Sequence, residues 1–96
     1  LLVMKAYDAG WASRMIAPYL APDGVMAAVQ NGMTADAVVE AVGASRSVGA
    51  VIECSATMTD PGVVHRHTPR ERSWFAVGAL PGGTGRIEPV ADLLAL

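Results

Sequence analysis

The chain has 96 residues, 52% of them hydrophobic, and a net charge of −2 with both signs scattered along its length. A chain of this size buries roughly two thirds of its unfolded surface, which sets one domain, or part of one, as the limit. The scattered charge excludes the basic field that nucleic acid requires, and no uncharged stretch reaches the ~20 apolar residues of a membrane helix.

The single cysteine and the two ends indicate what kind of chain this is. Cys54 has no second cysteine to pair with, which suits a reducing compartment. Residues 1–4 lead directly into Lys5 and a helical pattern, so no secretory leader is recognisable. We therefore expect a cytoplasmic protein. Both ends lie inside predicted elements, and we expect the 96 residues to be a piece of a longer chain.

The first part of the chain pairs an apolar run with a helical pattern. Residues 1–4 form a short continuous apolar run, typical of a strand that is covered on both faces in a parallel sheet. In residues 6–20 apolar side chains recur every three or four positions, which predicts an amphipathic helix that ends before Pro22 and Gly24. Its predicted buried stripe consists of Ala12, Ile16, Tyr19 and Leu20, and other faces carry Asp8, Ser13 and Arg14.

The same alternation follows once more. Residues 24–29 predict a second strand, and residues 35–42 predict a helix with Thr34 as its N-cap and Gly43 just past its end. Residues 47–58 predict a third, long strand rich in β-branched side chains. The order β-α-β-α-β is typical of parallel strands joined by right-handed helical crossovers.

The pattern changes after the third run. Residues 59–62, Thr-Asp-Pro-Gly, are a strong turn signal, with proline and glycine placed for a type II turn. Residues 63–68 and 73–80 predict two further strands joined by the charged turn 69–72, so the sheet is expected to finish as an antiparallel hairpin or meander. A loop at 81–85 and a helix starting near Glu88 complete an α/β chain.

Two polar residues follow the first two predicted strands directly. Lys5 and Asn31 lie at the carboxyl ends of neighbouring strands, where open parallel sheets bind ligands. Strands lie about 4.8 Å apart, so both side chains can reach one ligand. They offer a cation with three donors and an amide with donors and an acceptor. Gly32 lets the backbone approach a ligand, or lets the chain turn with positive φ.

Each of these residues also has an ordinary interpretation. Lys5 taken alone is typical of a solvated residue at the start of a helix. Asn31-Gly32 is first of all a turn dipeptide. Their placement at equivalent corners of the sheet favours a ligand site over two unrelated features.

Other chemistry-bearing residues indicate structure rather than function. His65 and His67 share one strand face, but two ligands leave a zinc site incomplete, and ordinary strand histidines are favoured. Glu53 and Cys54 have no recognisable catalytic partner, so Cys54 is predicted to be a small buried hydrophobe. Residues 82–85 lack the lysine of a phosphate loop and predict a flexible connection. A solvated hairpin tip is favoured over an anion site for the cluster of Arg66, Arg70 and Arg72.

Four short runs together resemble one enzyme family. They are K-A-Y-D at 5–8, V-Q-N-G-M at 29–33, V-G-A-V-I-E-C-S-A at 48–56 and D-P-G-V-V-H at 60–65. In these residues the chain resembles ketopantoate reductase, also called 2-dehydropantoate 2-reductase, from residue 1 to about residue 78. The resemblance implies an NADPH-dependent oxidoreductase that reduces the 2-oxo acid ketopantoate to pantoate, on the route to pantothenate and coenzyme A.

The resemblance also implies an architecture. Members of the family have an N-terminal Rossmann domain and a C-terminal helical domain, with the active site between them. Residues 1–96 would be the C-terminal half of the NADP-binding Rossmann domain, a partial Rossmann-type sheet without its Gly-rich first half and without the helical domain. A homodimer is implied by the resemblance alone.

The family's binding residues transfer to this chain at matching positions. The lysine after the fourth family strand corresponds to Lys5. The asparagine that contacts both the nicotinamide side of NADP(H) and the substrate corresponds to Asn31, with Gly32 beside it. The small residue near the cofactor corresponds to Ala56, or to Ser55 if the register slips by one. No residue of the chain is assigned to a metal.

The family's general-acid lysine and its substrate-binding glutamate fall after residue 96. No catalytic residue is therefore assigned here, and we predict that the isolated chain is inactive and marginally folded. Two alternatives stay open. One is a related reductase that acts on another 2-oxo acid, and the other is a non-catalytic NADP(H)-binding sensor module.

Overall fold

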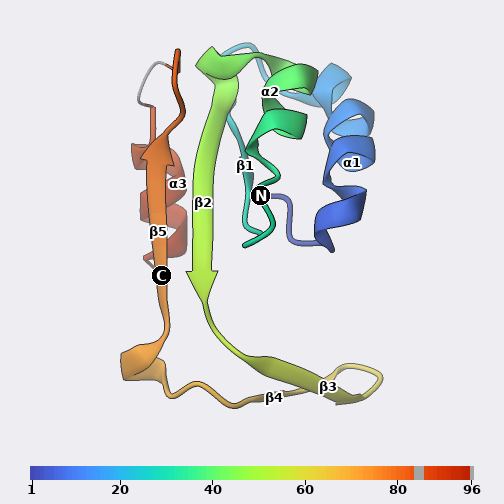
Figure 1. Cartoon of the computed structure of the whole chain (residues 1–96), viewed down its shortest axis with the longest axis vertical. Coiled ribbons are helices and arrows are strands. Elements are labelled where there is room, and N and C mark those ends of the chain that lie inside the picture. Colours follow the sequence, from blue (N-terminus) through green and yellow to red (C-terminus); the bar gives the residue numbers. More distant parts are fainter. Residues whose placement is uncertain (84–85, 96) are drawn as a thin grey trace.

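The computed structural model describes residues 1–83 and 86–95 and has an α/β architecture with a mixed sheet and a separate hairpin (Figure 1). The strands of the mixed sheet, in spatial order, are β1 (Met26–Ala28), β2 (Ser47–Glu53) and β5 (Trp74–Ala79). β1 and β2 run parallel, and β2 and β5 antiparallel. The hairpin pairs β3 (Ala56–Asp60) with β4 (Val63–Arg66).

Helices cover both faces of the mixed sheet. The α-helices are α1 (Ala9–Ile16), α2 (Ala35–Val42) and α3 (Glu88–Leu94). Short 3-10 turns flank them at η1 (Ala6–Asp8), η2 (Ala17–Tyr19), η3 (Ala44–Arg46) and η4 (Arg70–Arg72). In Figure 1, α1 and α2 lie together on one side of β1, whereas α3 lies behind β2 and β5.

The alternation of side chains along β1 divides the core into two clusters. Met26 and Ala28 point toward α1 and α2, where they pack with Leu2, Ala12 and Val38. Ala27 points the other way and packs with Val48 and Val90, so that α3 closes the opposite face. All three residues of β1 are buried, so this strand, which is shorter than the predicted residues 24–29, is covered on both faces.

Helix α1 buries a smaller face than its apolar pattern predicts. Ala9, Ala12 and Ser13 are buried, whereas Ile16 and Tyr19 are exposed, so the predicted stripe is wrong at these two positions. Small side chains let α1 and α2 approach closely. The Ser13 hydroxyl donates to the Ala9 carbonyl at 2.7 Å, which satisfies it inside this contact.

The first predicted strand is shorter than expected. Leu2 alone forms a parallel bridge, opposite Ala28. Its N–H donates to the Ala27 carbonyl at 2.8 Å, and its carbonyl accepts from the Val29 N–H at 3.0 Å. The parallel order of the first three predicted strands is therefore present, and the full Rossmann arrangement stays a prediction.

The third predicted strand is wrong in its length because the chain bends after Glu53. Residues 47–58 do not form one strand, since β2 ends at Glu53 and the chain continues as β3, which pairs with β4 in the separate hairpin. Thr68 fixes the bend: its hydroxyl accepts from the Ser55 N–H at 2.8 Å, and its own N–H donates to the Ser55 carbonyl at 3.3 Å. As a result β5 returns beside β2 instead of pairing with β4, and the meander is replaced by a hairpin and a long-range pair.

The second helix has the predicted bounds, and its C-terminal signal is confirmed. Gly43 follows the last helical residue with φ of 80°, a conformation that favours glycine. Thr34 precedes the first helical residue, but its side chain forms no cap. The expected helix at Glu88 is also present as α3. Of the predicted loop, positions 84 and 85 lie outside the described residues. No helix among the described residues is long and apolar enough to cross a membrane.

Candidate functional site

The side chain of Asn31 extends the parallel ladder beyond the end of β1. Its Nδ2 donates to the Ile52 carbonyl at 2.7 Å, and the Ile52 N–H donates to its Oδ1 at 3.0 Å. Ala28 of β1 pairs with Gly49 of β2. Because the two strands run parallel, continuing this register by three residues on each strand places Asn31 opposite Ile52. The carboxamide therefore occupies the place of a backbone amide, and β2 holds it in one orientation.

This pairing leaves half of the carboxamide free for another partner. A carboxamide has two N–H donors and two acceptor lone pairs, and Ile52 uses one of each. Asn31 is exposed at the carboxyl edge of the sheet. Because both bonds to Ile52 act on a planar group, they fix the direction of the remaining N–H and lone pair.

The two predicted corners of the sheet lie against each other. A Cβ built on Gly32 would stand 2.8 Å from the Cβ of Ala6, the residue that follows Lys5. Lys5 is exposed, and its carbonyl accepts from the Asp8 N–H at 3.0 Å, which starts the η1 turn. The structure thus brings together the segments that carry Lys5 and Asn31.

The turn after Asn31 differs from the expected glycine turn. The residue with positive φ is Met33, at 55°, and not Gly32. Gly32 is required instead for its close approach to Ala6, where a side chain would not fit. A methionine in the left-handed region is uncommon, so the surrounding contacts must hold this loop in place.

Gln30 and Thr34 supply those contacts, and sequence reasoning assigned a role to neither of them in the site. The Thr34 hydroxyl donates to Gln30 Oε1 at 3.1 Å, and Gln30 Nε2 donates to the Leu2 carbonyl at 2.8 Å. Thr34 was expected to cap α2, but its hydroxyl is turned toward the loop. The sequence feature that could have indicated this contact is the spacing of Gln30 and Thr34, which are four residues apart and flank Asn31-Gly32.

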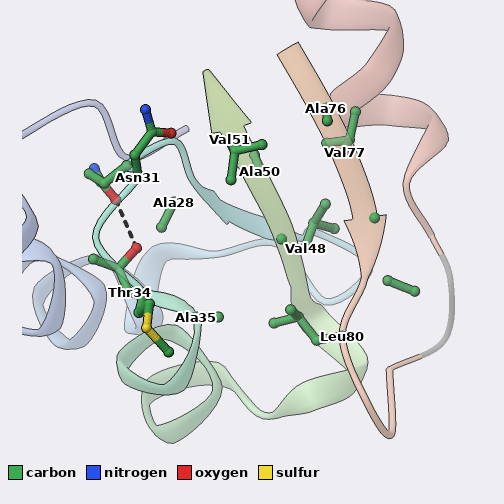
Figure 2. A pocket seen from close by; sticks show the side chains of 15 residues that line it. Ala28, Asn31, Thr34, Ala35, Val48, Ala50, Val51, Ala76, Val77 and Leu80 are labelled. Atoms are coloured by element: carbon green, nitrogen blue, oxygen red, sulfur yellow. Dashed lines mark hydrogen bonds between the residues drawn. The ribbon is translucent and has the colours of Figure 1, made fainter. Parts of the chain in front are cut away.

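A cavity of about 460 Å³ opens beside this loop (Figure 2). The loop and the start of α2 form one wall, and β2 and β5 form the floor. Figure 2 shows Asn31 at the rim and Val48, Ala50, Val77 and Leu80 along the strands, with the dashed line marking the bond from Thr34. Among its described lining residues the polar side chains are Gln30, Asn31 and Thr34, and Lys5, Gly32 and Ala56 are not part of it.

Ala56 stands apart from the two corners. It is the exposed first residue of β3 and pairs with Arg66 in the hairpin. The alternative, Ser55, lies in the bend, where Thr68 engages its backbone. Asn31 is bonded to Ile52, four residues before Ala56, so the bend separates Ala56 from the loop that holds Asn31.

The remaining candidates lie outside this arrangement. Cys54 is exposed, so its prediction as a buried hydrophobe is wrong; the bend after Glu53 carries it out of the sheet. The Nε2 atom of His67 lies 2.9 Å from the Thr57 hydroxyl, an ordinary contact across the hairpin. Within residues 1–83 and 86–95, no three His, Cys, Asp or Glu side chains are grouped so that they could hold a metal ion.

Comparison with known proteins identifies a family. The family model for ketopantoate reductase PanE/ApbA matches residues 1–81. Comparisons with curated proteins and with solved structures each give no match. The matching family consists of nicotinamide-dependent oxidoreductases. Its model spans the Lys5 corner, the Asn31 loop and the hairpin, and the chain therefore belongs to the ketopantoate reductase PanE/ApbA family.

Proposed function

We propose that the full-length protein reduces ketopantoate to pantoate with NADPH, and that residues 1–96 are the second half of its cofactor-binding Rossmann domain. The family match supports a reductase of this kind. The observation that carries the proposal is the rigid carboxamide of Asn31, held by Ile52 at the carboxyl edge of the sheet and beside the Lys5 segment.

The residues of this edge suit a nicotinamide cofactor. Asn31 offers one N–H and one lone pair, which match the acceptor and donor of a carboxamide or of a hydroxyl group. The approach of Gly32 to Ala6 keeps the edge free of bulky side chains. The bound cofactor supplies the hydride.

The same two corners suit the 2-oxo acid. Reduction places negative charge on the carbonyl oxygen, and a donor already directed at that oxygen stabilises the charge without reorganising. Asn31 has its remaining N–H fixed in direction, and Lys5 brings a mobile cation. The cavity beside Asn31 is lined mainly by apolar and small residues, so we assign the substrate carboxylate to the Lys5 side.

The test is NADPH oxidation by the full-length protein with ketopantoate and with a panel of other 2-oxo acids. Asn31→Ala is expected to lower kcat with ketopantoate by on the order of one hundredfold, because a lost transition-state donor has about that effect. Lys5→Met is expected mainly to raise KM, since it removes a charge that attracts the carboxylate in ground and transition states alike.

Other outcomes identify the alternatives. Faster turnover of another 2-oxo acid than of ketopantoate would make the protein a related reductase of different specificity. Tight NADPH binding without turnover of any 2-oxo acid would identify a sensor module. In that case Asn31→Ala should weaken cofactor binding alone.

A further inference from the structure

The loop that presents Asn31 is closed by the side chains of its neighbours. Gln30 and Thr34 stand on either side of residues 31–33, and the Thr34 hydroxyl donates to Gln30 Oε1 at 3.1 Å. Thr34 is buried, with 8% of its surface exposed, and Gln30 is half-buried. The bond therefore lies largely out of water, where it resists competition from solvent.

The other end of the Gln30 carboxamide reaches the first segment of the chain. Its Nε2 donates to the Leu2 carbonyl at 2.8 Å and lies 3.9 Å from Met4 Sδ. The Leu2 carbonyl also accepts the Val29 N–H, so the two contacts converge on one oxygen. Lys5 follows this segment directly, so Gln30 ties the segment before Lys5 to the loop of Asn31.

We infer that Gln30 and Thr34 are positioning residues that act through Asn31. Their bond, the Gln30–Thr34 clasp, holds the loop in the conformation in which Met33 has φ of 55°. Ile52 fixes the carboxamide of Asn31 on one side, and the clasp fixes its backbone on the other. The inference rests on the proposed function, because Asn31 must contact cofactor or substrate for the clasp to matter.

The hydrogen-bond roles make the clasp separable from simple packing. Thr34→Val keeps the shape of the side chain and removes its donor, whereas Thr34→Ser keeps the donor and removes a methyl group. If Thr34 serves packing alone, Thr34→Val should behave more like the wild type than Thr34→Ser. If the clasp matters, Thr34→Ser should behave more like the wild type. Thr59→Val, at an exposed position of β3, is the matched control.

The experiment measures kcat, KM and NADPH binding of these variants in the full-length protein. We expect Thr34→Val to lower kcat about tenfold with a nearly unchanged KM for the 2-oxo acid, since misplacing a reacting group by a fraction of an ångström has effects of this order. Thr34→Ser should restore kcat to within about twofold, and Thr59→Val should leave it unchanged.

Combination with Asn31→Ala shows whether the clasp acts through Asn31. In that background Thr34→Val should lower kcat by less than about twofold, because the group it positions is gone. A full tenfold loss in that background would overturn the inference. So would a Thr34→Val protein that melts at a lower temperature but has wild-type kcat, since the clasp would then serve stability only.

NADPH binding keeps this inference distinct from the proposed reaction. If the wild-type protein binds NADPH but reduces no 2-oxo acid, the proposed reaction fails, and a weaker Kd in Thr34→Val that Thr34→Ser restores would still support the clasp. Equal Kd values for wild type and Thr34→Val would then overturn it. A protein that neither binds NADPH nor reduces a 2-oxo acid would contradict both.

Discussion

A Cβ atom at Gly32 would lie 2.8 Å from the Cβ of Ala6. Two carbon atoms do not approach this closely without displacement, so the contact fixes how near the Asn31 loop comes to the Lys5 segment. Glycine at position 32 is therefore a steric requirement of the site and not a conformational one.

Gly32→Ala is expected to destabilise the full-length protein by about 1–3 kcal/mol, the usual effect of overpacking. The added methyl group must push the two corners apart, because Ala6 Cβ is a short, inflexible neighbour. Urea unfolding measures the change. Gly78→Ala is the control: a Cβ there meets no atom within 4 Å of the described chain, and stability should stay within about 0.5 kcal/mol. If the contact is responsible, adding Ala6→Gly to Gly32→Ala raises stability instead of lowering it further.

Asn31→Asp is expected to be less stable than Asn31→Ala. The introduced carboxylate would direct an oxygen at the Ile52 carbonyl, which now accepts a hydrogen bond at 2.7 Å. Alanine leaves both Ile52 groups to water, since the site is exposed. We expect Asn31→Asp to lower the free energy of unfolding by about 1–2 kcal/mol relative to wild type.

The pH dependence of that variant provides a second check. Protonation restores a donor to the introduced carboxyl, so its deficit relative to wild type should shrink as the pH falls toward about 3.9, the ordinary aspartate pKa. Urea unfolding at pH 7 and at pH 4 compares the two proteins. A deficit that is independent of pH would argue against the carbonyl contact as its cause.

Arg46 ties the start of β2 to the segment that leaves η2. Its guanidinium donates to the carbonyls of Gly24 and Leu20, each at 3.2 Å, and of Ala21 at 2.5 Å. Arg46→Met should lower the free energy of unfolding by about 2 kcal/mol, because several carbonyls lose a charged donor together.

Arg46→Lys should recover only part of that loss, since a single ammonium group cannot match the guanidinium fork. Arg72→Met, in the exposed η4 turn, serves as the control and should change stability by no more than about 0.5 kcal/mol. Equal stability of Arg46→Met and wild type would show that the three carbonyls are as well satisfied by water.

The isolated 96-residue chain is expected to have a free energy of unfolding below about 3 kcal/mol and to reduce no 2-oxo acid. Its core consists mostly of alanine and valine, and Val38 is the largest side chain with less than 2% of its surface exposed among the described residues. Trp11, Trp74 and Phe75 are 61%, 52% and 41% exposed, so much of the surface of these large side chains is not buried in the core. Circular dichroism during urea titration measures this stability, and a cooperative transition above about 5 kcal/mol would contradict the expectation.

Local patterns predicted the kind and order of most helices and strands, but not the lengths of the first and third strands or how the strands pair. The bounds of α2 follow from an apolar period between Thr34 and Gly43, which are neighbours in sequence. The bend at Cys54 does not follow from the same information, because a bond from Ser55 to Thr68 thirteen residues later holds it. Ser13 was predicted to lie outside the buried face of its helix, but it is buried, for a related reason. Only the contact between α1 and α2 makes a small polar residue preferable at this position.

The sequence indicated candidate site residues but not their geometry. Asn31 at the end of an apolar run indicated a ligand-facing corner, and the family match covers it. Its pairing with Ile52 depends on the register of β1 against β2, which no single-strand pattern contains. Gly32 was expected to approach a ligand or to turn with positive φ, whereas its close contact in the structure is with Ala6, which only the folded chain reveals.

The hairpin of β3 and β4 projects from the sheet, away from the helices (Figure 1), and every residue of both strands is exposed. A two-stranded ribbon without a core is marginally stable, so it opens at a low free energy. Ala56 begins this ribbon. A ligand that contacts Ala56 only while β3 and β4 are paired binds only the molecules in which the hairpin is formed. Its apparent affinity is therefore reduced in proportion to the fraction of molecules with the hairpin formed.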